Sequence, residues 1–224
     1  MDSRVPTTTS AKSAPMIDPV TGKPYGADHL LISEIVSPGS RVLDVGCGDG
    51  VLLQLLSDTQ AVDGRGMEIE REKVNACVAR GLSVVQGDAD FDLDDYPDQA
   101  FDYAILSLTI QATKHPKPVL ENLLRIGRYA IVSFPNFGHW SIRAKLLFSG
   151  RMPRTRNLPE PWYLSTDTHL CTIADFADLC RDINVHVEQA VALNSSGRRL
   201  PINRSPQLQN LFGEKAVFVL RGRD

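Results

Sequence analysis

Short apolar runs alternate with amphipathic segments through most of the chain. The runs have the length and composition of buried strands, and the segments between them repeat apolar residues at helical spacing. We expect strands at 41–45, 65–69, 82–86, 101–108, 129–134, 185–193 and 215–221, and helices at 29–36, 51–56, 71–79, 119–126, 140–148 and 172–183. Because strands that alternate with helices form βαβ units, this order predicts a parallel sheet covered by helices.

The last two expected strands depart from this alternation. Between them lies a turn-rich stretch, Asn194 to Pro206, with no convincing helical pattern. Two strands that follow each other without a helix favour an antiparallel hairpin. The chain is therefore predicted to have an α/β, Rossmann-like fold, with a mostly parallel seven-stranded sheet and a C-terminal antiparallel hairpin.

Composition along the chain predicts its domain organisation. Residues 1–15 are rich in Ser, Thr and Pro, which predicts disorder, and the Pro and Gly residues of 16–25 predict an irregular lead-in. Neither an internal repeat nor a linker is recognisable in the residues that follow. We therefore expect a disordered N-terminal tail and lead-in over residues 1–25 and a single domain over residues 26–224.

The overall composition is that of a globular protein and narrows the possible partners. Of the 224 residues, 42% are apolar and 23% are charged, and the formal net charge of −3 gives no reason to expect a nucleic acid as partner. Neither a signal peptide nor an apolar stretch of membrane-spanning length is recognisable. We therefore expect a soluble protein of the cytoplasm that does not associate with membranes.

The cysteines and histidines do not indicate a metal centre. The four cysteines, at positions 47, 77, 171 and 180, include no CxxC pair, and the five histidines do not fall at ligand spacing. Cysteines of this kind are expected to be reduced and mostly buried. No metal site is predicted.

The strongest chemical signal is the run VLDVGCGDG at residues 42–50, where a strand is expected to turn into a helix. Its glycines permit positive φ and let a ligand approach the backbone, and the helix after them offers free N–H groups. A dinucleotide-binding loop is the rival interpretation, but that fingerprint is GxGxxG, and Val51 stands where its third glycine should be. Asp44, just before the loop, suits a ligand with an ammonium group, whereas it would repel a pyrophosphate.

Two acidic residues follow the glycine loop at the ends of later strands. Glu68 ends the second expected strand, where an acidic side chain can accept hydrogen bonds from ribose hydroxyls. The alternative is that Glu68 is one of several solvated charges in the run 68–72, but its two neighbours are residues of the sheet. Asp88 follows the third expected strand and is placed to meet the adenine end of a nucleoside.

These segments resemble the class I methyltransferases that depend on S-adenosylmethionine (SAM). The loop VLDVGCGDG, the acid in GMEIE and the GDAD after the third strand carry the likeness. The antiparallel end of the sheet also suits the class I methyltransferase fold. We expect SAM or S-adenosylhomocysteine to bind at Asp44, Gly46, Cys47, Gly48, Gly50, Glu68, Asp88 and Ala89.

Three further segments give a narrower likeness. SLTIQAT at 107–113, SFPNFGHW at 133–140 and HLCTIADF at 169–176 resemble the MetW family of methionine biosynthesis proteins. This resemblance implies a role beside homoserine O-acyltransferase, the enzyme that acylates homoserine, since MetW-like proteins are associated with supporting that enzyme. A methyl transfer by the chain itself does not follow from the resemblance, so a catalytic methyltransferase acting on a small molecule is the alternative.

The sequence assigns no catalytic residue, but two histidines are candidates for a general base. His115 follows the fourth expected strand and His139 the fifth, at the edge where ligands of open α/β sheets bind. Both are more simply interpreted as surface or capping residues. Phe137 and Trp140 lie beside His139 and are interpreted either as core or as a docking surface. We expect a protein partner to dock on SLTIQAT and on the loop 135–140.

Overall fold

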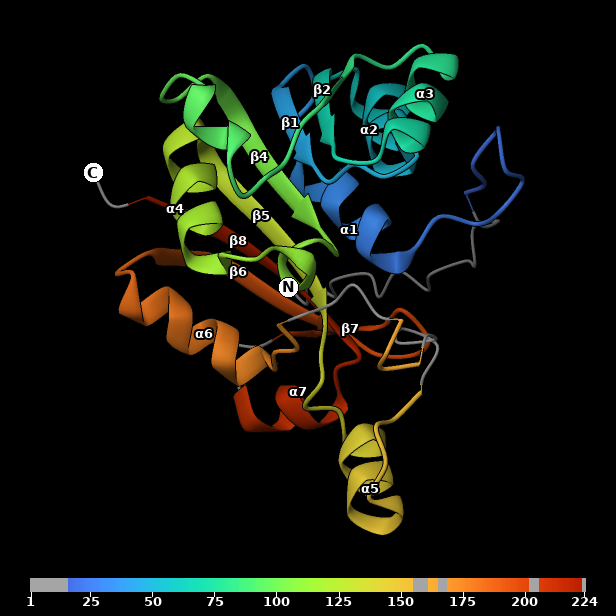
Figure 1. Cartoon of the computed structure of the whole chain (residues 1–224), viewed down its shortest axis with the longest axis vertical. Coiled ribbons are helices and arrows are strands. Elements are labelled where there is room, and N and C mark those ends of the chain that lie inside the picture. Colours follow the sequence, from blue (N-terminus) through green and yellow to red (C-terminus); the bar gives the residue numbers. More distant parts are fainter. Residues whose placement is uncertain (1–15, 155–160, 165–168, 202–205, 223–224) are drawn as a thin grey trace, which may run out of the picture.

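The computed structural model describes residues 16–154, 161–164, 169–201 and 206–222, which form one sheet with helices on both of its faces (Figure 1). The tail that is expected to be disordered, residues 1–15, lies outside the described residues.

The helices α1 to α6 lie close to the positions that the apolar spacing predicts. They are α1 (Ala27–Ile35), α2 (Val51–Gln60), α3 (Arg71–Ala79), α4 (Pro116–Ile126), α5 (Trp140–Ser149) and α6 (Ile173–Asp182). The spacing does not predict α7 (Pro206–Phe212) or the short 3-10 helices η1 (Asp92–Asp95) and η2 (Ile110–Ala112). At the start of α6, the Thr172 hydroxyl accepts from the Asp175 N–H at 3.2 Å, and the Asp175 carboxylate accepts from the Thr172 N–H at 2.9 Å. This reciprocal cap fixes where α6 begins.

The sheet has eight strands in the order β3-β2-β1-β4-β5-β8-β6-β7. They are β1 (Arg41–Val45), β2 (Asp63–Glu68), β3 (Val84–Gln86), β4 (Phe101–Ser107), β5 (Gly127–Pro135), β6 (His186–Leu193), β7 (Arg199–Pro201) and β8 (Lys215–Arg221). The strands β1 to β5 are parallel, and β8 lies antiparallel between β5 and β6. The α/β class, the mostly parallel sheet and the antiparallel C-terminal strands are thus confirmed.

The predicted number of seven strands is wrong, because the stretch before β8 holds more structure than its turn residues indicate. β7 pairs antiparallel with β6, and α7 lies between β7 and β8. The strand has three residues and the helix seven. Neither element is long enough to show a clear apolar period.

Apolar side chains cover both faces of the sheet. On the face of α4 and α6, the rings of Phe134, Phe176 and Phe218 pack with centroids 4.8 to 5.9 Å apart. The other face packs against α1 and α2. Because side chains alternate along a strand, Val42 and Leu43 of β1 enter opposite clusters. Burial on both faces is the reason why central strands such as β4 and β8 are nearly continuous apolar runs in the sequence.

The four cysteines are unpaired, and most of them are buried. Cys47, Cys77 and Cys180 are buried, Cys171 is half-buried, and all four are free thiols. Among the described residues, no helix has the length and apolar character needed to cross a membrane. In the same part of the chain, no group of three or more His, Cys, Asp or Glu residues is arranged to hold a metal ion.

Candidate functional site

The glycine loop connects the end of β1 to the start of α2, and its three glycines have positive φ. Gly46, Gly48 and Gly50 have φ values of 68°, 57° and 78°, a region that favours glycine. The N–H groups of Gly46 and Cys47 both donate to the carbonyl of Met67 in β2, at 2.8 and 3.1 Å. The loop is therefore anchored at the carboxyl edge of the sheet, where ligands of such folds bind.

The three glycines differ in their surroundings. A Cβ on Gly46 would lie 2.4 Å from Thr109, and one on Gly50 would lie 2.5 Å from Leu82. No atom lies within 4 Å of the position that a Cβ on Gly48 would take. Packing therefore requires the first and third glycines, whereas Gly48 faces open space that a ligand can occupy.

Glu68 ends β2 and lies against this loop. Its Oε2 accepts a hydrogen bond of 2.8 Å from the Gly48 N–H, and its Oε1 accepts one of 3.0 Å from the Glu70 N–H. Glu68 is 5% exposed, so it is not one of the solvated charges of the run 68–72. Each carboxylate oxygen has a further lone pair that a ribose hydroxyl can use.

Asp44 is a buried carboxylate whose oxygens lack donors. It is 1% exposed, and neither oxygen has a hydrogen-bond partner in the structure as described. Burial, and to a smaller extent the charge of Glu68, raise the pKa of Asp44 to about 7. A buried polar group without a partner is costly. An ammonium group would supply both the opposite charge and the missing donors.

The segment after β3 reaches the same edge of the sheet. The Gly87 N–H donates to the carbonyl of Glu68 at 3.0 Å, and Asp88 Oδ1 accepts from the Asp90 N–H at 3.0 Å. Asp88 and Ala89 are half-buried. The structure thus brings these two residues into the neighbourhood of Glu68, while their contact with a nucleoside stays a prediction.

Both candidate bases lie at the beginning of a helix. His115 is exposed at the N-cap of α4, and its backbone N–H donates to Asp90 at 2.8 Å. His139 is the N-cap of α5, is 8% exposed, and accepts from the Ser141 N–H through Nδ1 at 3.4 Å. Burial lowers the pKa of His139, which favours the neutral ring that such a cap needs. His139 therefore caps α5. Among the described contacts of His115, none is with the glycine loop.

The segment SFPNFGHW contains the centre of a buried hydrogen-bond network, the side chain of Asn136. Asn136 is 1% exposed, and its Nδ2 donates to the carbonyls of Asn210 and Gly213, both at 2.8 Å. Its Oδ1 accepts from the N–H groups of Gly138 and Ile173, at 3.0 and 3.1 Å. One side chain thereby ties the end of β5 to both α6 and α7.

The segment SLTIQAT also packs inward. Ile110, Gln111 and Thr113 are buried. The Gln111 side chain donates to the carbonyl of Pro135 at 3.1 Å, and the Gln111 carbonyl accepts from the His169 N–H at 3.0 Å. The three segments of the narrower likeness therefore contact one another inside the protein. The expectation that SLTIQAT is a docking surface is wrong for these buried residues.

Two residues that contact the loop were not predicted from the sequence. Thr109 Oγ1 donates to the carbonyl of Gly46 at 3.3 Å, and Cys77 Sγ donates to the carbonyl of Gly48 at 3.2 Å. Thr109 stands within SLTIQAT, and Cys77 occupies an apolar position of a helix. Neither position carries a signal that points to the loop, because both contacts join segments distant in the chain.

Most of the chain matches a known protein family. The family model described as methionine biosynthesis protein MetW matches residues 26–220. The chain belongs to the MetW family. The bifunctional methionine biosynthesis protein MetXA/MetW of Rhodopirellula baltica is 34% identical over 202 residues, which cover 86% of this chain and 32% of that protein. This MetW-family chain thus spans about a third of the length of its relative.

Solved structures share the fold of this MetW-family chain at low sequence identity. A SAM-dependent methyltransferase from Thermotoga maritima is 16% identical, with a TM-score of 0.62 and 88% of each chain covered. Another from Mesorhizobium loti is 15% identical, with a TM-score of 0.64 and coverage of 88% of this chain and 98% of that chain. The [4+2]-cyclase SpnF is 17% identical, with a TM-score of 0.60 and coverage of 87% and 80%. The class I methyltransferase fold is confirmed, but because a cyclase shares it, the fold does not identify a reaction.

Proposed function

We propose that the protein binds SAM or S-adenosylhomocysteine at the glycine loop and supports homoserine O-acyltransferase in methionine biosynthesis. The main support for this ligand is the state of Asp44: its two buried carboxylate oxygens lack the hydrogen-bond donors that an ammonium group would bring. Gly48 leaves room for close approach, and Glu68 offers acceptors to ribose hydroxyls. The proposed binding residues are Asp44, Gly46, Cys47, Gly48, Gly50, Glu68, Asp88 and Ala89.

The loop cysteine has a packing role in this proposal. Cys47 is 8% exposed, and burial raises the pKa of its thiol far above the usual value. The thiol is therefore neutral and unreactive at physiological pH. Free, mostly buried thiols are typical of a reducing compartment, which supports a cytoplasmic location.

The link to homoserine O-acyltransferase is supported by a relative that carries two functions in one chain. The name MetXA/MetW describes that protein as bifunctional, and the match to this chain covers only 32% of it. Fusion keeps two modules at a high effective concentration. We infer that the separate MetW-family chain acts next to the protein that corresponds to the other part, the homoserine acyltransferase MetX.

We place the docking of homoserine O-acyltransferase at α5. In Figure 1 this helix projects from the body of the protein. Its first residue, Trp140, is 52% exposed, and Leu147 and Phe148 near its end are 79% and 84% exposed. Gathered exposed apolar side chains are typical of protein interfaces, and aromatic residues are the usual anchors. We therefore assign the partner surface to Trp140 and the rest of α5, and not to SLTIQAT, whose residues Ile110, Gln111 and Thr113 are buried.

The partner proposal is tested by measuring the rate of purified homoserine O-acyltransferase with increasing amounts of this protein, with and without SAM. We expect a saturable rise in rate and co-elution of the two proteins in size-exclusion chromatography. Trp140→Ala should weaken association by about thirtyfold, the usual effect of losing an aromatic anchor. Val78→Ala, which truncates a 58% exposed apolar residue on α3, is the matched control and should act like the wild type. If the wild-type protein neither raises the rate of the acyltransferase nor co-elutes with it, the partner proposal is refuted.

A catalytic methyltransferase acting on a small molecule is the second candidate. The SAM-dependent methyltransferases of similar structure favour it. SAM supplies an electrophilic methyl group when bound, and an oxygen acceptor would also need a positioned base. Because Nδ1 of His139 is engaged in the cap, only Nε2 of that ring is left for such a role. Sustained formation of S-adenosylhomocysteine by the pure protein, without the acyltransferase, would favour this candidate over a supporting role.

A further inference from the structure

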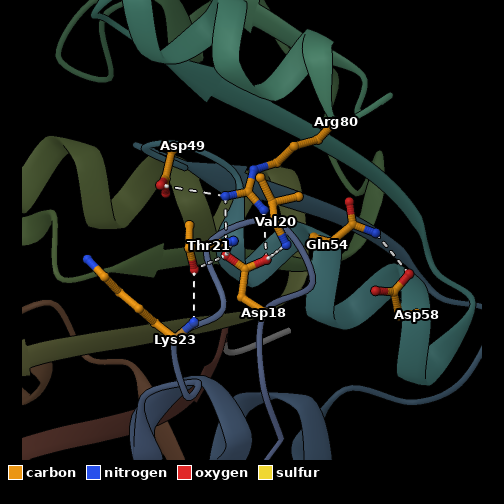
Figure 2. Close-up of polar contacts among 8 residues, drawn as sticks. All are labelled: Asp18, Val20, Thr21, Lys23, Asp49, Gln54, Asp58 and Arg80. Atoms are coloured by element: carbon orange, nitrogen blue, oxygen red, sulfur yellow. Dashed lines mark hydrogen bonds and ion pairs between the residues drawn. The ribbon is translucent and has the colours of Figure 1, made fainter.

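Residues 16–25 form a closed turn before α1, organised by one carboxylate (Figure 2). Asp18 accepts hydrogen bonds from the backbone N–H groups of Val20 and Thr21, at 3.2 and 3.3 Å, and from the Thr21 hydroxyl at 2.5 Å. The Asp18 N–H donates to the carbonyl of Lys23 at 2.9 Å, which closes the turn. The lead-in is therefore built around Asp18, which is 1% exposed.

Asp18 is joined to Arg80, the C-cap residue of α3, by a buried ion pair. Nη1 of Arg80 lies 2.9 Å from Oδ1 and Nη2 lies 3.3 Å from Oδ2, in the two-pronged geometry that fixes a guanidinium plane. The Arg80 side chain is 5% exposed and the Asp18 side chain is 2% exposed. Hydrogen bonds from Arg80 hold the pKa of Asp18 well below its usual value in spite of burial, so both groups are charged at neutral pH.

Arg80 also reaches the glycine loop. Its Nη2 lies 3.7 Å from an oxygen of Asp49, the residue between Gly48 and Gly50, as Figure 2 shows. The Asp49 side chain is 54% exposed, so this contact alone is weak. The end of α3 makes a second contact with the loop, because Cys77 donates to the carbonyl of Gly48. The turn, the end of α3 and the loop thus form one connected unit.

We propose that Asp18 and Arg80 are positioning residues for the adenosyl ligand, which act on the loop through Asp49. This inference rests on the proposed SAM binding and goes beyond it. Asp18 fixes the orientation of the guanidinium, and the guanidinium holds the residue next to Gly48, which faces the open space of the site. Asp18 lies before residues 26–220, which the family model matches. The contact that orients Arg80 therefore comes from a part of the chain outside the family match.

The test compares three variants of the full chain: Asp18→Asn, Asp49→Asn and the double variant. Calorimetry with S-adenosylhomocysteine measures affinity, and thermal melting measures stability. Each single change should weaken affinity by about tenfold, and the double change by little more, because residues of one network act non-additively. Asp18→Asn should also lower the melting temperature, since it leaves the buried Arg80 without its counter-charge.

Arg125→Met provides a matched control for stability. Arg125 lies at the end of α4, 2.7 Å from Asp98, and donates to the carbonyls of Leu93 and Tyr96. This change should lower the melting temperature and leave the affinity unchanged, because it removes an arginine network that no described contact joins to the loop.

A lower melting temperature with unchanged affinity in Asp18→Asn would make the pair merely structural and overturn the proposal. If Asp18→Asn does not fold, unchanged affinity in Asp49→Asn overturns it equally. Absence of binding by the wild type would instead refute the proposed ligand, and the positioning role with it.

Discussion

Oε2 of Glu68 accepts a hydrogen bond of 2.8 Å from the N–H of Gly48, so the residue that ends β2 also fixes the middle glycine of the loop after β1. Glu68 ends β2 and Gly48 follows β1, and the carboxyl ends of these neighbouring parallel strands meet at one edge of the sheet. A side chain in this position shapes the loop and offers acceptors to a ligand at the same time.

Replacing Glu68 by alanine should therefore weaken binding of S-adenosylhomocysteine. Hydrogen bonds to a charged group contribute about 1.5–3 kcal/mol, which corresponds to a loss of roughly tenfold to a hundredfold in affinity. Calorimetry measures the change. Glu70→Ala is the control, because Glu70 contacts Glu68 only through its backbone N–H, which alanine keeps. Equal affinities of wild type and Glu68→Ala would remove Glu68 from the site.

The three loop glycines should respond differently to alanine. Gly48→Ala places a methyl group in open space at a φ of 57°, with a strain of about 1–2 kcal/mol, so the protein should fold but lose affinity for the ligand. Gly46→Ala and Gly50→Ala force a Cβ to within 2.4 and 2.5 Å of neighbouring atoms and should lower the melting temperature much more. Unchanged ligand affinity in a folded Gly48→Ala would show that the ligand does not lie against this residue.

The affinity for a ligand with an ammonium group should depend on pH through Asp44. Its pKa is raised to about 7, and the ammonium group needs the ionised carboxylate, so affinity should rise as pH increases through about 7. The same raised pKa means that Asp44 binds a proton more tightly in the folded than in the unfolded chain. Its contribution to the free energy of unfolding therefore falls as pH rises from 3.8 toward about 7.

Calorimetry at several pH values, with wild type and Asp44→Asn, checks the prediction for Asp44. The variant should bind weakly and lose that pH dependence. A wild-type affinity that stays constant across this range would argue against direct contact between Asp44 and the ammonium group.

Asn136→Ala should destabilise the fold strongly. The change leaves two carbonyls and two N–H groups buried without their partner, and each unsatisfied group costs about 1–3 kcal/mol, which relaxation of the neighbouring loops reduces in part. We expect the free energy of unfolding in urea to fall by about 3 kcal/mol or more. Asn122→Ala on α4 removes an exposed hydrogen bond to Asp94 and one that the side chain accepts from Arg125, and it should cost much less. Similar losses in the two variants would contradict the central role of Asn136.

Much of the fold was predictable because strands buried on both faces are apolar runs in the sequence. The apolar run predicted as a strand at 101–108 is β4 (Phe101–Ser107), buried between two layers of helices. α7 was missed although Pro206 at its first position and Gly213 after its last are ordinary helix boundaries. Its seven residues are too few for an apolar period to stand out among turn residues.

For the candidate site, the sequence predicts only the placement of residues that are close together in the chain. Asp44, the three glycines and Glu68 follow from the spacing of residues near the ends of two strands. The pairing of Asp18 with Arg80 spans 62 positions, and Asp18 stands in a stretch of Pro and Gly that predicts only irregular structure. The inward packing of Gln111 and Asn136 likewise depends on tertiary contacts, so polar segments that resemble a surface form the interior.

The place of β8 has a consequence for how the chain is made. β8 lies between β5 and β6, both of which precede it in the chain, and pairs with each along seven positions. A ribosome delivers β5 and β6 first, so their facing edges stay open until residue 221 has emerged. Open strand edges invite pairing with other chains. The nascent protein is thus most exposed to aggregation just before this strand arrives, and a chain shortened by the seven residues 215–221 would keep that vulnerability permanently.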